Sequence, residues 1–490
     1  MQPEEHTPIR KDPRTIPLRS VARRRSPIST WRYLLVLLAH AGLAFAMWNS
    51  ELVATAHALV TFGVGILWAA SGRRPERVAW VAAYIVGAEV LWRMTETRIF
   101  WEFGKYATAA IFVISLLRSR RRKPLVSLFL YFALLIPSSF IVISELAAGR
   151  ARRELSFNLA GPLALAVAAW FFSNVRLTRE ERVRLFLAML APIASIAALV
   201  LSGTMNTSDV VFASGISNEA MSGGFAPNQV SAVLGLGALL CFFVLSEERL
   251  PKGLRLLLFA GLVGLASQSA LTFSRGGLYM AAGSATVASL FLMRDARSRV
   301  KVLLVAGLCF VVAKYVVLPR LDAFTGGSLI ERFQDTGLTK RGDIARADIE
   351  TWKSHLLFGV GPGLSKNYRD MLVSASGRQY TLHTHTEYTR LLAEHGLFGL
   401  VALILMLSAA YRAVRQARSR KGKAFSASLL VWSLLFMLVY AMRLATPSFI
   451  FGLAFASLEE EGGVARVPRG THRFPGPAPS ALATSPARST

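Results

Sequence analysis

The chain has 490 residues, of which 53% are hydrophobic and only 17% are charged, a composition that argues against a soluble enzyme. The formal net charge is +27 at pH 7, but the basic residues lie in short connectors between apolar runs, so the charge gives no support for nucleic-acid binding. Both cysteines, Cys241 and Cys309, lie inside apolar runs, where neither a disulfide nor a metal site is supported.

Apolar runs follow one another along most of the chain. A helix needs roughly 20 apolar residues to cross a bilayer, and several runs are near the lower limit, so we expect about 12–14 transmembrane helices. The predicted fold class is therefore an all-α polytopic integral membrane protein. The predicted spans cover residues 31–49, 52–70, 78–93, 99–117, 124–146, 156–174, 185–203, 228–245, 254–273, 277–293, 301–318, 391–412, 424–441 and 446–457.

Basic residues mark every second connector, which predicts the orientation by the positive-inside rule. The N-terminal tail, residues 1–30, is also basic, and we place it in the cytoplasm together with a disordered C-terminal tail, residues 458–490, which is rich in Pro, Ala, Ser and Arg. The opposite connectors are poor in Lys and Arg, with one violation at GRARRE, residues 149–154. The six basic connectors are 71–77, 118–123, 176–184, 247–255, 294–301 and 415–423.

One connector on the outer side is much longer than the others. It covers residues 319–390, between the last spans of a transmembrane domain that we place at 31–457. It contains Trp352 and a GVGPG turn at 359–363, which favour a folded subdomain. Loops of this length are usually functional, so we expect a folded periplasmic loop that carries chemistry.

The sequence HTHTE, which ends at Glu387, stands directly before an apolar span. Thr384 and Glu387 have capping-box spacing, which predicts a helix with His385 in its first turn and an end or kink at Gly396. The positive end of the helix dipole disfavours protonated histidine and leaves a basic nitrogen available. Two alternatives stay open, namely a metal site formed by His383, His385 and Glu387, and polar residues at a membrane interface.

Three arginines belong to the same outer side. Arg275 lies in SRGG between two spans, where Gly276 and Gly277 are expected to form a tight turn, and Arg341 and Arg346 lie in the long loop. Arginine presents a planar, permanently charged fork to phosphate oxygens, so these residues beside a neutral histidine suit a lipid-linked diphosphate. Further candidate substrate-binding residues are Arg443, His383, Asn228 and Arg346.

Four segments together resemble the O-antigen ligase and polymerase (Wzy_C-type) superfamily of bacterial membrane glycosyltransferases. They are GGFAPNQVSAVLGLGALL (223–240), SRGG (274–277), KRGDIARADIETWKSHLLFGVGPG (340–363) and HTEYTRLLAEHGLFGL (385–400), within a region of about 220–440. The resemblance implies about a dozen helices, a large periplasmic loop, and inverting transfer of a glycan from undecaprenyl diphosphate to an acceptor hydroxyl, without a metal ion or other cofactor.

Carried over by motif, the family's histidine corresponds to His385, and its two arginines correspond to Arg275 and Arg341. These three are the predicted catalytic residues: His385 activates the acceptor hydroxyl, and the two arginines hold the diphosphate. The chain departs from the family pattern at Thr386, where asparagine is usual, and at Leu356, where proline is usual.

The resemblance leaves the acceptor open. A ligase transfers to a completed lipid core, whereas a polymerase transfers to a growing lipid-linked glycan, and a transporter or flippase of lipid-linked sugars is the alternative of another class. Expected partners are the undecaprenyl diphosphate-linked donor, a lipid or glycan acceptor, membrane lipids and polysaccharide-assembly proteins, with no nucleic acid. The expected location is the bacterial inner membrane, with both termini in the cytoplasm.

Overall fold

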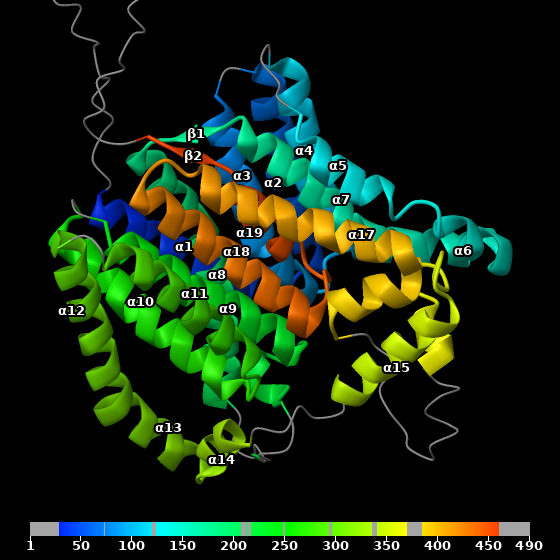
Figure 1. Cartoon of the computed structure of the whole chain (residues 1–490). Coiled ribbons are helices and arrows are strands. Elements are labelled where there is room, and N and C mark those ends of the chain that lie inside the picture. The colour runs from blue at the N-terminus through cyan, green and yellow to red at the C-terminus, as the bar shows by residue number, and fades with distance from the viewer. Residues whose placement is uncertain are drawn as a thin grey trace, which may run out of the picture.

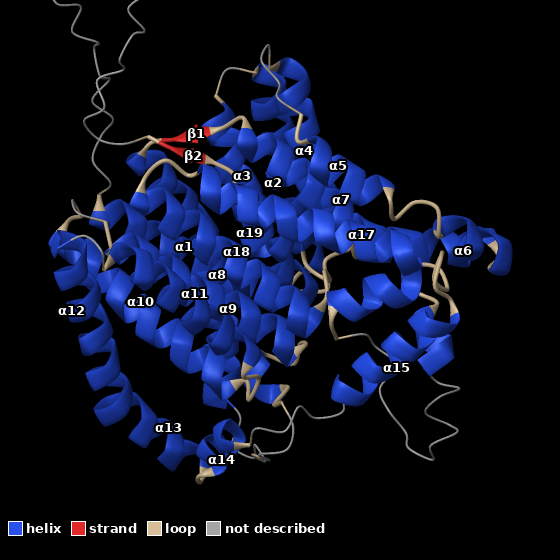
Figure 2. Cartoon of the chain, viewed as in Figure 1, coloured by secondary structure: helices blue, strands red, loops and turns tan. Residues whose placement is uncertain are grey.

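The computed structural model describes residues 29–72, 74–119, 124–206, 212, 217–247, 250–293, 296–335, 341–369 and 385–459. Nearly all of this part of the chain is helical, and its only strands are two residues long, as Figure 2 shows. These strands, β1 (Arg176–Leu177) and β2 (Ser457–Leu458), pair in parallel. Residues 1–28 and 460–490, which include most of both predicted tails, lie outside the described residues, as does His383.

Nine helices in the described residues are long and apolar enough to cross a membrane, and α11 (Gly276–Leu292) is a shorter apolar helix. The prediction of a helical, multi-pass membrane protein is therefore confirmed. The nine are α1 (Thr30–Trp48), α2 (Glu51–Ser71), α7 (Ala148–Ser173), α8 (Arg179–Asn206), α9 (Pro227–Leu245), α10 (Lys252–Leu271), the span Val302–Thr325, α17 (Glu387–Gln416) and α18 (Arg420–Tyr440).

Other helices are too short, or not apolar enough, to belong to that set. The predicted span 124–146 is broken between α5 (Val126–Ala133) and α6 (Ser139–Glu145), at a segment that contains Pro137, whose ring removes a backbone donor. The predicted span 446–457 is the short helix α19 (Ala445–Leu453). The remaining helices of the first half are α3 (Pro75–Met94) and α4 (Phe103–Arg118).

The predicted span 301–318 continues beyond its expected end. Helix α12 (Ala296–Val312) passes through a π-helical turn, Ala313–Val317, into α13 (Leu318–Thr325), so the expected start of the long loop lies inside a helix. Figure 1 shows α12 and α13 as an arc along one edge of the molecule. Beyond them, α14 (Ser328–Gln334) and α15 (Arg341–Ser354) belong to the predicted loop.

Close backbone packing joins the helices that position the site. A Cβ at Gly277 on α11 would collide with the Ser231 carbonyl on α9, and a Cβ at Gly235 would collide with the Gly277 carbonyl. Small residues let membrane helices approach to backbone contact. The start of α9, which carries Asn228, is therefore fixed against the start of α11, which follows Arg275.

Contacts also join the basic connectors to one another. Arg179 and Arg182 form ion pairs with Glu247, and β1 pairs with β2 close to the end of the described chain (Figure 1). Thr30 lies within contact range of Gly253, and Gly72 within contact range of Arg118. Both ends of the described chain therefore meet basic connectors, and the motifs of the predicted site lie on other connectors.

Candidate functional site

A kink divides α17 and gives the GVGPG segment its place. Gly396 has φ 60° and ψ −135°, which confirms the predicted interruption. The kink frees the carbonyls of Ala393 and Glu394, and these accept hydrogen bonds from Val360 N (2.9 Å) and Gly361 N (3.0 Å). Backbone groups inside a membrane protein need such internal partners, so the turn completes the hydrogen bonding of the broken helix.

The N-terminus of α17 differs from the prediction. The cap is Thr386, whose Oγ1 accepts from Tyr388 N at 3.3 Å, and the helix begins at Glu387. His385 therefore lies just before the cap and not in the first turn, and Thr384 lies outside the described residues. The prediction failed because both Thr384 and Thr386 precede the helix closely enough to be candidates for its cap. His385 is half-buried at the end of the helix.

The turn that carries Arg275 also differs from the prediction. The chain reverses between α10 and α11 through Phe273, which is buried and has a left-handed φ of 56°. Gly276 and Gly277 instead begin α11. Their missing side chains allow close approach, because a Cβ at Gly276 would collide with the Tyr440 hydroxyl. Residues 273–277 thus combine a strained turn at Phe273 with a tight helix contact at Gly276.

Three arginines gather around this turn, and we name Arg275, Arg332 and Arg341 the turn cluster. Arg275 donates to the carbonyl of Arg332 (3.4 Å), and Arg332 donates through Nε to the carbonyl of Phe273 (3.1 Å). Arg341, the first residue of α15, lies over the ring of Tyr440 at 5.8 Å. Burial and the charges of Arg275 and Arg341 lower the pKa of Arg332, which a bound anion would offset.

A polar network joins the turn cluster to the predicted histidine. Ser274 Oγ donates to Asn228 Oδ1 and is hydrogen-bonded to the Tyr440 hydroxyl, both at 2.9 Å. Asn228, Tyr440, His385 and Arg443 line a cavity of about 100 Å³, together with Ala226, Gln229 and Phe436. We call it the small cavity. The sequence-predicted residues Asn228, His385 and Arg443 meet there.

Arg443 lies on an unwound strap, residues 441–444, between α18 and α19. Ala441 has a left-handed φ of 53°, which is costly for a residue with a side chain. Buried carboxylates fix both ends of the strap: Glu387 Oε2 accepts from Met442 N (3.3 Å), and Glu89 Oε2 accepts from Ala445 N (2.7 Å). Arg93, paired with Glu89, donates to the carbonyl of Arg443 (3.2 Å).

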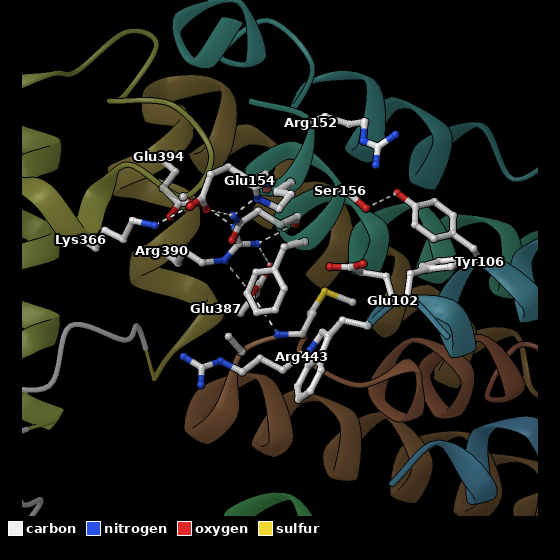
Figure 3. A pocket seen from close by; sticks show the side chains of 18 of the residues that line it. Glu102, Tyr106, Arg152, Glu154, Ser156, Lys366, Glu387, Arg390, Glu394 and Arg443 are labelled. Atoms are coloured by element: carbon white, nitrogen blue, oxygen red, sulfur yellow. Dashed lines mark hydrogen bonds and ion pairs between the residues drawn. The ribbon is translucent and has the colours of Figure 1, made fainter. Parts of the chain in front are cut away.

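A second, larger cavity of about 1120 Å³ lies on the other side of Gln229 and Arg443, which line both cavities (Figure 3). We call it the large cavity. Its remaining lining residues come from the start of α4 and the loop before it, from α7, from residues 363–369, from α17 and from the strap. They are Phe100, Trp101, Glu102, Tyr106, Arg152, Arg153, Glu154, Ser156, Phe157, Asn158, Gly363, Lys366, Arg369, Glu387, Arg390, Glu394, Ala441 and Met442.

A buried ionic group along this cavity was not predicted from the sequence. Arg390 forms a bidentate pair with Glu387 (2.5 and 3.0 Å) and also donates to Glu394 (2.6 Å), as Figure 3 shows. Arg369 is buried and lies 3.4 Å from Asp348 Oδ1. The i, i+3, i+4 spacing of opposite charges inside an apolar segment, EYTRLLAE, is the signal that would have indicated the first three residues.

We name Arg369, Arg390 and Arg443 the buried cluster. Burial, and then the nearby guanidinium groups of Arg369 and Arg390, lower the pKa of Arg443 to about 10. Neighbouring positive charges repel one another, and a bound anion would reduce this repulsion. The strap therefore presents a positive side chain to both cavities.

Two predicted substrate-binding residues are not brought to these cavities. Arg346 is exposed on α15 and lines neither of them, and the predicted catalytic residues Arg275 and Arg341 line neither of them as well. His383 lies outside the described residues. Within the described ranges, no group of three or more His, Cys, Asp and Glu side chains is placed to hold a metal ion.

Comparison with known proteins identifies part of the chain. The protein-family model Wzy_C, described as O-antigen ligase, matches residues 260–404, which hold Arg275, Arg341 and His385. The matched region is shorter than the resemblance seen in the motifs, and Asn228 and Arg443 lie outside it. No curated protein matches the chain. Residues 260–404 are an O-antigen ligase domain of the Wzy_C family, whose members are O-antigen ligases and polymerases.

Proposed function

We propose that the chain is an inverting, metal-independent glycosyltransferase that moves a glycan from undecaprenyl diphosphate to an acceptor hydroxyl in surface polysaccharide or lipopolysaccharide assembly. The matching family implies glycan transfer and lipid-linked glycan substrates. The observation that supports the finer assignment is the small cavity, where His385 and Arg443 meet beside the tyrosine that lies under Arg341.

In this proposal the turn cluster binds the leaving diphosphate. Arg275 and Arg341 supply guanidinium groups, and fixed positive groups stabilise negative charge that develops in the transition state. Arg332 adds a third charge, and burial, followed by repulsion from the other two, lowers its pKa. The departing undecaprenyl diphosphate carries the electron pair of the broken bond to the anomeric carbon.

His385 acts as the general base. Its imidazole accepts the proton of the acceptor hydroxyl while the hydroxyl oxygen forms the new bond to the anomeric carbon. Attack opposite the leaving group inverts the configuration in one displacement. Asn228 and Tyr440, which line the same cavity and share Ser274, orient the polar groups around this step.

We assign the end of the molecule that carries the small cavity to the periplasm, and the end with the basic connectors to the cytoplasm. The ion pairs of Arg179 and Arg182 with Glu247 join two basic connectors, 176–184 and 247–255, at that second end. Positive residues flank the cytoplasmic ends of membrane helices. In this orientation residues 319–390 contribute the periplasmic part of the site, and both tails lie in the cytoplasm.

The assignment is tested with purified protein, a defined undecaprenyl diphosphate-linked glycan and two acceptors, in the presence of a chelator. Product formation with a lipid-core acceptor supports a ligase, whereas extension of a lipid-linked glycan supports the second candidate, a polymerase. Movement of the intact lipid-linked glycan across liposomes without any new glycosidic bond would replace the proposal by a transporter. Loss of product on chelation would overturn its metal-independent chemistry.

A further inference from the structure

We propose that the large cavity binds the acceptor glycan, and that this acceptor carries carboxylate or phosphate groups which Arg152 and Arg153 contact. This inference rests on the proposed function, because it assigns the acceptor side of the same site. Fourteen of the residues that line the cavity, Arg152 and Arg153 among them, lie outside the matched family segment 260–404.

The first support is an anomaly in the charge pattern. The segment 149–154, GRARRE, is the one basic connector on the side that the positive-inside rule expects to be poor in Lys and Arg. The structure places Arg152 and Arg153 along the large cavity, whereas the adjacent Arg150 is exposed and does not line it. A positive charge that opposes the orientation rule needs another reason to be there, and a negatively charged ligand supplies one.

The second support is the balance of charge in the cavity. Three of the acidic side chains are engaged by basic ones: Glu154 by Lys366 (2.5 Å), and Glu387 and Glu394 by Arg390. Arg152 and Arg153 form no ion pair with any carboxylate in the described ranges, and both are exposed at the rim. Figure 3 shows Arg152 apart from the paired groups. Such a rim attracts anions and holds carboxylate or phosphate oxygens in a planar fork.

The third support is the aromatic part of the lining. Trp101 is 46% exposed and Phe100 is 55% exposed, and Arg93 lies 4.2 Å from the centre of the Trp101 ring. The hydroxyl of Tyr106 is hydrogen-bonded to Ser156 at 3.1 Å. The negative face of an aromatic ring attracts the weakly positive C–H bonds on the flat side of a sugar. A cavity that combines exposed rings with charged side chains therefore suits a saccharide.

The sequence of contacts from the turn cluster through the small cavity to the large cavity supports binding of the acceptor in the large cavity. The turn cluster touches Tyr440, Tyr440 lines the small cavity, and Arg443 joins the small cavity to the large one. An inverting displacement needs the attacking hydroxyl opposite the leaving group. If the diphosphate lies against Arg275 and Arg341, the acceptor approaches from the side of the large cavity, with His385 between them.

The experiment measures binding of soluble saccharides to the full-length protein in neutral detergent, by calorimetry at two salt concentrations. The carboxylate probes are tetragalacturonic acid and its neutral methyl ester, and the phosphate probes are phosphorylated maltotetraose and maltotetraose. The double variant Arg152→Gln with Arg153→Gln is compared with Arg150→Gln, which removes a neighbouring exposed charge away from the cavity. Each lost charge contact to an exposed site is worth about 0.3–1 kcal/mol.

We expect the wild type to bind at least one charged probe more tightly than its neutral partner, and the double variant to lose about 3- to 30-fold in affinity for it. The preferred probe identifies carboxylate or phosphate as the acidic group. Arg150→Gln should bind like the wild type. Equal binding of charged and neutral probes, or equal losses in the double variant and in Arg150→Gln, overturns the inference.

Failure of the two proposals is distinguishable, because binding requires no turnover. If the protein bound the acidic probe through Arg152 and Arg153 but transferred no glycan, the acidic-saccharide site would stand and the proposed transferase function would be wrong. If the protein transferred glycan to neutral and acidic acceptors with the same KM, the proposed transferase function would stand and the preference for an acidic acceptor would be wrong.

Discussion

The two arginine clusters adjoin the small cavity, through Tyr440 and through Arg443, and are held in different ways. In the turn cluster Arg275 and Arg332 donate to main-chain oxygens, Arg341 lies over Tyr440, and one ion pair joins Arg332 to the half-exposed Asp335 at 3.6 Å. The buried cluster is held by carboxylates, with Arg390 between Glu387 and Glu394. Carbonyl partners leave positive charge available to a ligand, whereas carboxylate partners cancel most of it.

This difference separates a binding role from a structural role. A buried ion pair contributes little net stability, yet removal of one partner leaves a buried charge and is strongly destabilising. Glu387 therefore serves mainly to hold Arg390 and the strap, through its bond to Met442 N. Arg443 is the exception within the buried cluster, since it lines both cavities from the strap.

The largest expected effect is at the histidine between the clusters. His385→Ala should lower glycan transfer in reconstituted membranes by about 10²–10⁴-fold, because a general base contributes that much. The control is His355→Ala, at a histidine that packs on Tyr368 and lines neither cavity. Transfer at the wild-type rate by His385→Ala would remove the general base from the proposed mechanism.

The sequence analysis singled out Arg275 and Arg341 of the turn cluster but only Arg443 of the buried cluster, for a physical reason. Arg275 and Arg341 lie in short motifs whose local chemistry is visible in the letters. The position of Arg390 depends on Asn158, 232 residues away, and the position of Arg443 depends on Arg93, 350 residues away. Hydrophobic periodicity predicts that helices exist and gives no register between distant helices.

Local details were also harder to predict than the helices. The cap of α17 is Thr386 where the sequence favoured Thr384, and the turn before α11 forms at Phe273 where glycine was expected. At the turn a tertiary contact decides the outcome, because Gly276 packs against the Tyr440 hydroxyl and begins α11. The kink at Gly396 was predictable because glycine itself marks it.

The second prediction compares the clusters directly. Arg341→Ala should lower transfer by about 10- to 100-fold with no loss of thermal stability, because a hydrogen bond to a charged ligand is worth about 1.5–3 kcal/mol. Arg390→Ala should lower the thermal midpoint as well, since it leaves Glu387 and Glu394 buried without their partner.

The matched control for Arg341 is Arg320→Ala, at an exposed arginine on α13. It should leave both transfer and stability unchanged. The assignment of a binding role to the turn cluster and a structural role to the buried cluster would be wrong if Arg341→Ala unfolded the protein. It would also be wrong if Arg390→Ala left the thermal midpoint at the wild-type value. Transfer and unfolding are measured on the same purified samples.

The third prediction concerns the kink that brings the buried cluster to the GVGPG turn. Gly396→Ala places a Cβ 2.6 Å from Gly359 N and Leu356 O at a φ of 60°, so it should destabilise the protein by at least about 1–2 kcal/mol. Gly42→Ala, in α1 with no atom within 4 Å of the new Cβ, should be neutral or stabilising by about 0.5–1 kcal/mol. Equal thermal midpoints for the two variants would contradict the role of the kink.

The smallest effect tests the charge environment behind the buried cluster. Burial raises the pKa of Asp348 to about 6, with Glu394 adding to the rise and with Arg369, Arg390 and the hydrogen bond from Thr389 opposing it. The folded state thus binds more protons than the unfolded state between pH ~4 and ~6, so Asp348 makes stability fall as pH rises through this window. Asp348→Asn should lack this slope, so the thermal midpoint of the variant minus that of the wild type should rise as pH increases from ~4 to ~6. A difference that is flat from pH ~4 to ~7 would contradict the raised pKa of Asp348. It would show that the positive charge of Arg369 completely offsets the effect of burial on the Asp348 carboxyl.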